Sequence, residues 1–185
     1  MANVQVVVLN GSSSAGKSSV AKALQRLAAK PFLHVAMDHF LDMLPERTLN
    51  HPDGITFQAV GDGDPPETAV FTGEVVERAL SGMRRAVAAL AGAGNHVIVD
   101  DVMLSGHEAD DYRALLGDVD LRLVGLHAPL EVLEARERQR GDRHLGQARW
   151  QHLRVHHGLD YDLELDTSLA APDELARRIR DAFGL

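Results

Sequence analysis

Residues 4–24 constrain the fold of this chain more than any other stretch. Residues 4–9 are apolar apart from Gln5 and mostly β-branched, a pattern typical of a buried strand. Residues 11–18 follow and match G-x-x-x-x-G-K-[ST] at each fixed position, and a helical pattern begins directly after them. In such an arrangement the glycine-rich backbone turns successive N–H groups inward, and the helix adds the positive end of its dipole. The segment predicts a loop that binds nucleotide phosphates, although a Gly/Ser turn could match the pattern by chance.

The loop supplies most of the predicted ligands of the nucleotide. Lys17 is expected to reach the β- and γ-phosphates, and the Ser18 hydroxyl is expected to ligate Mg²⁺. Arginines further along the chain are expected to add charge to the same site. The predicted nucleotide-binding residues are Gly11, Ser12, Ser13, Ser14, Ala15, Gly16, Lys17, Ser18, Ser19, Arg136 and Arg140.

Composition limits the class of protein and its partners. The chain has 185 residues, of which 45% are hydrophobic and 25% are charged, as expected for one globular domain spanning residues 1–185. The formal net charge of −8 argues against a nucleic-acid partner, since such partners favour basic surfaces. The absence of cysteine excludes disulfides and thiolate metal sites. Because no leader peptide and no membrane-length apolar run is evident, we expect a cytoplasmic protein without a membrane partner.

Strand and helix patterns alternate along the rest of the chain. This alternation predicts a three-layer α/β fold, in which a five-stranded parallel sheet carries helices on both faces. Loops at the carboxyl ends of such strands form the ligand crevice. The further expected strands are 32–37, 96–101, 121–126 and 163–165, and the expected helices are 39–44, 70–91, 107–116, 147–156 and those that begin at 129 and 172.

Residues 45–67 differ in character from the segments around them. They are polar and rich in Gly, Pro and Asp, and only a few apolar residues could anchor them in a core. A long segment of this kind in a compact domain usually has a function. We interpret it as a flap on the acceptor side with a short hairpin around 55–60. A decorated surface loop is the alternative.

Asp38 follows the second expected strand and is a candidate catalytic base. A carboxylate at this place could orient an acceptor hydroxyl and take its proton. An Asp directly before a helical stretch is also a preferred N-cap. The residue pattern leaves both roles open.

Asp100 and Asp101 follow the apolar residues 97–99 and are candidate Mg²⁺ ligands beside Ser18. Successive strand residues point to opposite faces, so at most one of the two carboxylates is expected to face the phosphates. His152 and His156 have the i, i+4 spacing of a zinc pair. They lack the intervening glutamate of H-E-x-x-H, which favours a partly exposed helix face instead.

An arginine cluster adjoins Gly141. It comprises Arg136, Arg138, Arg140 and Arg143. Arginine suits bidentate phosphate contacts, so the cluster predicts an Arg-rich lid over residues 138–146 that closes on the triphosphate. A solvated basic face is the alternative.

Taken in order, these segments resemble those of chloramphenicol phosphotransferases, a family of small P-loop kinases similar in fold to shikimate and adenylate kinases. The resemblance implies ATP, Mg²⁺ and transfer of the γ-phosphoryl group to a hydroxyl of a small molecule, here chloramphenicol. It also implies that Asp38 is the catalytic base and that Arg140 and Arg143 belong to a lid that faces the nucleotide. Together with Lys17 of the loop, they are the catalytic candidates. The matching segments are residues 9–18, 38, 97–102, 136–137, 140–143, 155–156 and 161–167.

Other acceptors remain open, since residues 45–67 match the family least. One alternative is a P-loop kinase for another metabolite or for a nucleotide sugar. A second alternative, from a different class, is a nucleotide-binding switch that hydrolyses slowly. The lid arginines and Asp38 favour transfer to an acceptor.

Overall fold

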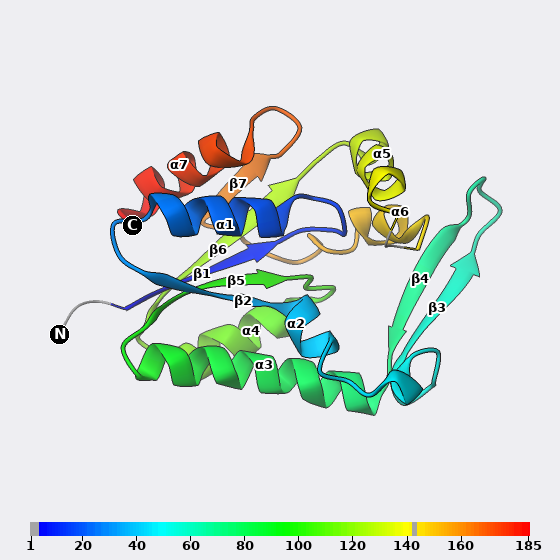
Figure 1. Ribbon diagram of the computed structural model, residues 1–185, viewed down its shortest axis with the longest axis horizontal. Coiled ribbons are helices and arrows are strands. Elements are labelled where there is room, and N and C mark those ends of the chain that lie inside the picture. The colour runs from blue at the N-terminus through cyan, green and yellow to red at the C-terminus, as the bar shows by residue number, and fades with distance from the viewer. Residues whose placement is uncertain (1–3, 142–143) are drawn as a thin grey trace.

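A parallel sheet of five strands forms the centre of the computed structural model, which describes residues 4–141 and 144–185. The spatial order of the strands is β2-β5-β1-β6-β7 (Figure 1). These strands are β1 (Gln5–Asn10), β2 (Phe32–Ala36), β5 (His96–Asp101), β6 (Asp120–His127) and β7 (Leu163–Asp166). The five-stranded parallel sheet expected from the alternating pattern is therefore confirmed.

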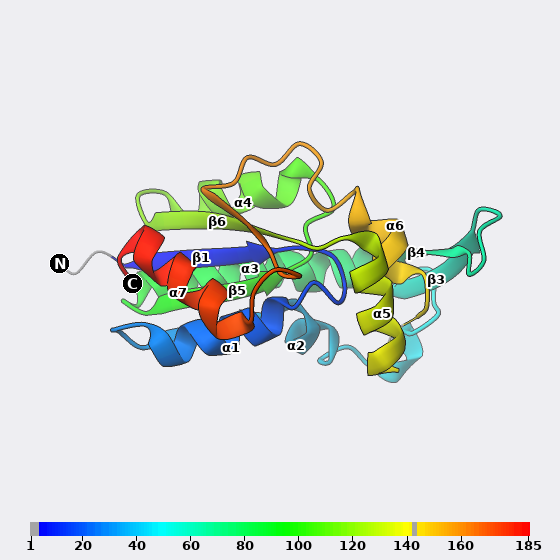
Figure 2. The same ribbon diagram turned by 90° about the horizontal axis from the view of Figure 1, so that it is seen from above.

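Helices cover both faces of this sheet, which gives the three layers that were predicted. The helices α1 (Lys17–Leu27) and α7 (Pro172–Phe183) lie on one face, and α3 (Glu74–Gly92) and α4 (Gly106–Leu116) lie on the other (Figures 1 and 2). Side chains of β1 alternate between the two resulting cores: Val7 packs toward α1 and α7, and Val8 packs toward α3 and α4. Because both faces are covered, every residue of β1 is buried.

A separate two-stranded sheet lies beyond the carboxyl ends of the parallel strands (Figures 1 and 2). It is the antiparallel hairpin of β3 (Ile55–Val60) and β4 (Glu67–Thr72), preceded by the short 3₁₀ helix η1 (Glu46–Thr48). The predicted hairpin around 55–60 covers only β3. Residues 70–72 were expected to begin the long helix, but they pair with β3, and α3 begins at Glu74. An apolar residue such as Val70 suits a strand as well as a helix, so the sequence did not mark this boundary.

Three short helices complete the end of the molecule that carries the loop. The helix α2 (Met37–Leu41) begins two residues before the predicted start, and α5 (Leu130–Arg140) ends in the arginine cluster. The helix α6 (Gln147–His152) is shorter than the predicted 147–156. No helix within residues 4–141 or 144–185 is both long enough and apolar enough to cross a membrane.

The helix α6 is fixed between α5 and the hairpin. Buried Glu137 of α5 accepts hydrogen bonds from the backbone N–H groups of Gly146 and Ala148, both at 2.8 Å. On the hairpin side, the Thr68 N–H donates to the carbonyl of Gly146 at 3.0 Å. Gly146 has a φ of 85°, and a Cβ at this position would lie 2.1 Å from the carbonyl oxygen of Pro66. Only glycine permits this close approach of α6 to the hairpin.

Candidate active site

The glycine-rich loop joins β1 to α1, and Lys17 closes over it. Gly16 has a φ of 89°, which allows the backbone to turn into α1. The Lys17 ammonium donates to the carbonyls of Gly11 and Ser12, at 2.9 and 3.0 Å. Its Nζ also lies 4.0 Å from Oδ1 of Asp100. The cation is thus positioned at the loop and beside a buried carboxylate.

Asp100 lies at the end of β5 and faces the loop. The Ser18 hydroxyl donates to its Oδ2 at 2.5 Å, and Nε2 of His34 lies 3.9 Å from the same oxygen. Burial lowers the pKa of His34 below its ordinary value, which favours the neutral imidazole beside this carboxylate. A hydroxyl and a carboxylate are oxygen ligands of the kind that Mg²⁺ prefers, so this pair fits the predicted metal.

Asp101 points to the opposite side of the sheet. Its Oδ2 accepts from the Tyr112 hydroxyl and its Oδ1 from the Val102 N–H, both at 2.8 Å. Burial raises the pKa of Asp101. Because its oxygens are engaged away from the loop, the prediction of Asp101 as a metal ligand beside Ser18 does not fit the structure. Asp100 alone of the pair faces the phosphate side.

Asp38 lies in the first turn of α2 and lines a small cavity of about 100 Å³ together with Lys17, Ser18 and Asp100. The N-cap of α2 is Ala36, so the alternative in which Asp38 is the N-cap is wrong. A carboxylate in this position can accept the proton of a hydroxyl placed beside the loop.

A second cavity, of about 530 Å³, adjoins the loop on the side of α1 and α7. It shares Ser14, Gly16, Ser19 and Arg140 with the cavity beside Asp38. The Arg136 guanidinium lies at its wall, where Nη1 donates to the hydroxyl of Thr167 at 2.9 Å and Nη2 to its carbonyl at 2.8 Å. This cavity has the place and size for the nucleoside part of a nucleotide whose phosphates lie on the loop. We call it the nucleoside-side cavity.

The predicted lid residues lie in different surroundings. Arg138 is exposed, whereas Arg140, the last residue of α5, lines both cavities that meet at the loop. Arg143 lies outside the described residues. Closure of residues 138–146 over a nucleotide therefore stays a prediction.

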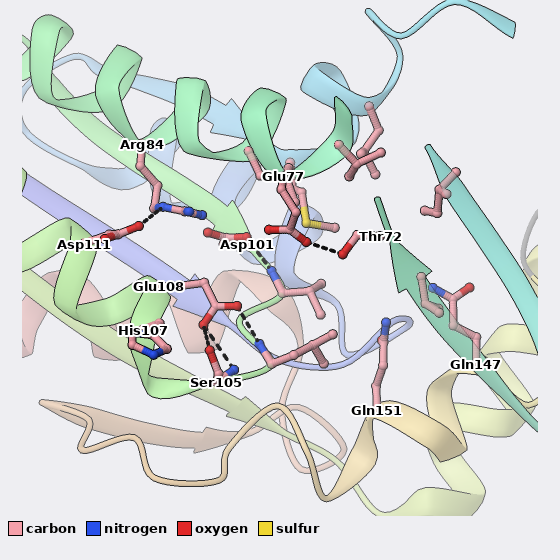
Figure 3. Close-up of a pocket in the computed structure, with 18 of the residues that line it drawn as sticks. Thr72, Glu77, Arg84, Asp101, Ser105, His107, Glu108, Asp111, Gln147 and Gln151 are labelled. Atoms are coloured by element: carbon pink, nitrogen blue, oxygen red, sulfur yellow. Dashed lines mark hydrogen bonds and ion pairs between the residues drawn. The ribbon is translucent and has the colours of Figure 1, made fainter. Parts of the chain in front are cut away.

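A third cavity, of about 520 Å³, opens between the hairpin, α3 and α4 (Figure 3). It meets the cavity beside Asp38 at four shared residues, which are Met37, Val102, Gln147 and Gln151. We call it the acceptor cavity. Its apolar lining consists of Met37, Leu41, Ile55, Phe57, Val70, Val76, Leu80, Val102 and Leu104.

Charged groups of the acceptor cavity pair with one another or with nearby hydroxyls (Figure 3). Nε of Arg84 donates to Oδ2 of Asp111 at 3.0 Å. Glu108 accepts from the Ser105 hydroxyl at 2.6 Å within a helix capping box, and Glu77 accepts from the Thr72 hydroxyl. Among the described residues of the lining, Arg84 is the one Lys or Arg, and it is neutralised by Asp111. The cavity therefore suits a molecule with an apolar body and uncharged polar groups.

Comparison with known proteins assigns the family. The sequence profile described as "Chloramphenicol phosphotransferase-like protein" matches residues 4–184. The chain belongs to this family. A curated relative, "Putative O-phosphotransferase Rv2636" of Mycobacterium tuberculosis strain H37Rv, is 34% identical over 184 residues, covering 97% of this chain and 82% of the relative. The predicted resemblance is confirmed, and the chain is an enzyme of the small-molecule kinase type.

Solved structures share the fold at low sequence identity. The APS kinase CysC of Mycobacterium tuberculosis, in complex with AMPPNP and APS, has a TM-score of 0.68 at 19% identity and covers 99% of each chain. A sugar kinase from Janibacter sp. HTCC2649 has a TM-score of 0.67 at 20% identity, covering 98% of this chain and 95% of that one. The tunicamycin resistance protein of Deinococcus radiodurans has a TM-score of 0.65 at 18% identity, covering 98% and 96%. The P-loop kinase fold of this chloramphenicol phosphotransferase-like chain is thus confirmed.

Gln151 is a site residue that the sequence did not reveal. It lies on α6, 138 positions from Ser13, yet its Oε1 accepts the Ser13 backbone N–H at 2.6 Å. A glutamine on a short polar helix is usually solvent-facing, whereas this one is only 3% exposed. No local pattern marks such a residue, because its role follows from how α6 packs.

A network behind the loop was also missed. Asn10, the last residue of β1, donates to the Tyr161 hydroxyl at 2.7 Å, and that hydroxyl lies 2.8 Å from Nδ1 of His156. The ring of His156 stacks on that of His127 at 3.9 Å. Burial, followed by the charge of His127, lowers the pKa of His156 to about 4. The helix face predicted for His152 and His156 is wrong for His156, because α6 ends at His152.

Proposed function

We propose that this chain transfers the γ-phosphoryl group of ATP, with Mg²⁺, to a hydroxyl of an uncharged small molecule in the acceptor cavity. Chloramphenicol is the first candidate acceptor, and its phosphorylation in the cytoplasm would inactivate the antibiotic. One observation carries the proposal: Asp38 and Lys17 line a cavity that adjoins the nucleoside-side cavity on one side and the acceptor cavity on the other. A phosphoryl donor and an alcohol bound in the outer two cavities would meet there.

Each residue at this junction has a role that its chemistry supports. The loop N–H groups and Lys17 bind the phosphates, and Arg140 adds positive charge from the end of α5. Ser18 and Asp100 would hold Mg²⁺, which would supply charge neutralisation at the phosphates when bound. Arg136 fixes the wall of the nucleoside-side cavity through Thr167. Arg143 is retained as a catalytic candidate from the sequence alone.

Asp38 acts on the acceptor. Its carboxylate accepts a hydrogen bond from the acceptor hydroxyl, which directs the oxygen toward the γ-phosphorus. The new bond joins the acceptor oxygen to phosphorus while the bond between phosphorus and the β,γ-bridging oxygen breaks. The hydroxyl proton passes to Asp38, and ADP leaves.

The chemistry of the acceptor cavity favours an uncharged alcohol. Its walls are largely apolar, and its one described Arg is already paired with Asp111. An anionic acceptor would bring a charge into a cavity that also holds Glu77 and Glu108, without a free cation among the described residues to neutralise it. Chloramphenicol, an uncharged aromatic alcohol, meets these conditions.

A direct test is an acceptor panel read by mass spectrometry. The wild-type protein is incubated with ATP, Mg²⁺ and, separately, chloramphenicol, tunicamycin, glucose, gluconate, shikimate or APS. We expect chloramphenicol to gain one phosphate group, and the anionic members gluconate, shikimate and APS to gain none. Lys17→Ala is the negative control. Phosphorylation of only the anionic compounds would contradict the proposed acceptor class, and transfer to no member of the panel would contradict the proposed acceptor chemistry.

A further inference from the structure

Gln151 connects the phosphate loop to the acceptor cavity. The Ser13 N–H is a donor, and in an amide side chain only the oxygen can accept from it, so the hydrogen bond of 2.6 Å fixes Oε1 of Gln151 toward the loop. The side-chain NH₂ group must then point the other way. Figure 3 shows this nitrogen directed into the acceptor cavity. The two ends of one amide thus face the two halves of the site.

The backbone that carries Gln151 is held in place on two sides. Glu137 binds the N-terminal end of α6, and Thr68 joins the residues just before α6 to the hairpin through its N–H and through its hydroxyl, which donates to the Leu145 carbonyl at 2.6 Å. A hydrogen-bonding group supported in this way loses little conformational entropy on meeting a substrate. Among the described residues, no protein oxygen accepts a hydrogen bond from Nε2 of Gln151, which leaves this donor available to a molecule in the cavity.

We propose that Gln151 positions the acceptor for phosphoryl transfer: its carbonyl fixes Ser13 of the phosphate loop while its NH₂ group binds an oxygen of the acceptor. A single side chain thereby sets the distance between acceptor and phosphates. This inference rests on the proposed function and adds to it a residue that holds the two substrates in register. In phosphoryl transfer such alignment contributes directly to the rate.

Two substitutions separate the two ends of the amide. Gln151→Met keeps the length of the side chain and removes both hydrogen bonds. Gln151→Glu keeps an oxygen for the Ser13 N–H and removes the nitrogen donor. Leu153→Gln is the matched control, because Leu153 follows α6 and is 79% exposed. Wild type and the three variants are first compared by thermal unfolding and by the affinity for ADP.

The decisive measurements are acceptor kinetics and hydrogen exchange. With chloramphenicol, or the panel member that the wild type phosphorylates best, we expect both Gln151 variants to lose ~10–100-fold in kcat/KM for the acceptor, the effect of one or two lost hydrogen bonds. ADP affinity of Gln151→Met should stay within about threefold of wild type. Exchange of the Ser13 amide, followed by NMR, should be fast in Gln151→Met and slow in wild type and Gln151→Glu.

Three results would overturn the inference. They are wild-type acceptor kinetics in both variants, a loss that lies entirely in ADP affinity, and a slowly exchanging Ser13 amide in Gln151→Met. If Gln151→Met does not fold, Gln151→Glu still decides the role of the nitrogen. A failure of the proposed function can be told apart from a failure of this inference. If the proposed function is wrong, the wild-type protein itself phosphorylates no alcohol of the panel.

Discussion

The two halves of the site are built in different ways. The phosphate half comes mainly from one continuous segment, residues 11–18, with Asp38 added from the first turn of α2, Asp100 from the end of β5 and Arg140 from the end of α5. The acceptor cavity takes its walls from the hairpin, α2, α3, α4 and α6, and from the carboxyl end of β5 and the residues just after it, with no run of more than a few residues from any one of them. The first half can be recognised in a sequence and the second can only be recognised in a fold.

This difference reflects what each half binds. Phosphates are the same in every nucleotide, and backbone N–H groups with one Lys are sufficient to bind them. An acceptor is particular to one enzyme, and its shape is matched by apolar side chains and a few polar groups. Changes in the phosphate half should therefore reduce transfer to any acceptor, whereas changes in the acceptor cavity should alter affinity for one.

Lys17→Ala should have the largest effect. Removing the ammonium at the loop removes charge neutralisation at the phosphates, and we expect kcat to fall by about 10⁴-fold, in the range known for cations that act on transferring phosphates. Lys22→Ala, on the exposed side of the same helix, is the control. The measurement is the initial rate of acceptor phosphorylation. A rate within tenfold of wild type would show that the loop does not act as proposed.

Asp38→Asn should come next. We expect kcat to fall by ~10²–10⁴-fold, the range for loss of a general base, while ADP affinity is unchanged. Asp42→Asn serves as the control, since Asp42 is exposed just after the same helix. Turnover and isothermal titration with ADP check the two expectations. Near-normal turnover would assign Asp38 a structural role.

Phe57→Ala should affect the acceptor alone. The Phe57 ring lines the acceptor cavity and stacks on the ring of His144 at 3.9 Å. Its loss should raise the KM for the acceptor by about tenfold and leave the KM for ATP unchanged, as one buried aromatic contact predicts. Phe71→Ala is the matched control, because Phe71 lies on the adjacent strand, is 48% exposed and does not line the cavity. Equal changes in both KM values would remove the distinction between the halves.

Acid should lower the stability of the fold through His156, which belongs to the hydrogen-bond network behind the loop. The pKa of His156 is lowered to about 4 in the fold, whereas the unfolded chain takes up this proton near the ordinary value of 6.5. Between these values the unfolded state binds more protons, so the free energy of unfolding decreases as pH falls from 6.5 toward 4. After allowance for solvent screening, we expect about 1 kcal/mol from this residue.

Urea unfolding at pH 7 and pH 5 measures this dependence. His156→Gln should show a smaller loss of stability between the two pH values than wild type. His51→Gln, at an exposed histidine, should match wild type. A pH dependence in His156→Gln as steep as that of wild type would contradict the assignment.

The sequence predicted the fold and the phosphate half because both depend on local signals. Alternating apolar runs defined the sheet, and the motif at 11–18 defined the loop. The order of the two Asp residues at the end of β5 could not be decided locally, since strand alternation says only that they differ in direction. The structure resolves it, with Asp100 toward Ser18 and Asp101 toward Tyr112.

The acceptor half could not be predicted for a physical reason. Gln151 and Arg84 acquire their roles only when α6 reaches the loop and α3 packs beside α4. The start of α3 was misplaced because apolar Val70 is compatible with a helix or a strand, and only its pairing with β3 assigns it to β4. Burial and partners over long sequence separations are set by tertiary packing rather than by propensity.

Acceptor-dependent release of ADP tests the central claim most directly. The rate of ADP formation is measured in a coupled assay with ATP and Mg²⁺, with and without each alcohol of the panel. We predict that an uncharged alcohol, chloramphenicol first, raises the rate by about 10²-fold or more over the basal hydrolysis, and that Asp38→Asn abolishes this increase. The same basal rate with every alcohol would contradict the account and would favour a nucleotide-binding switch.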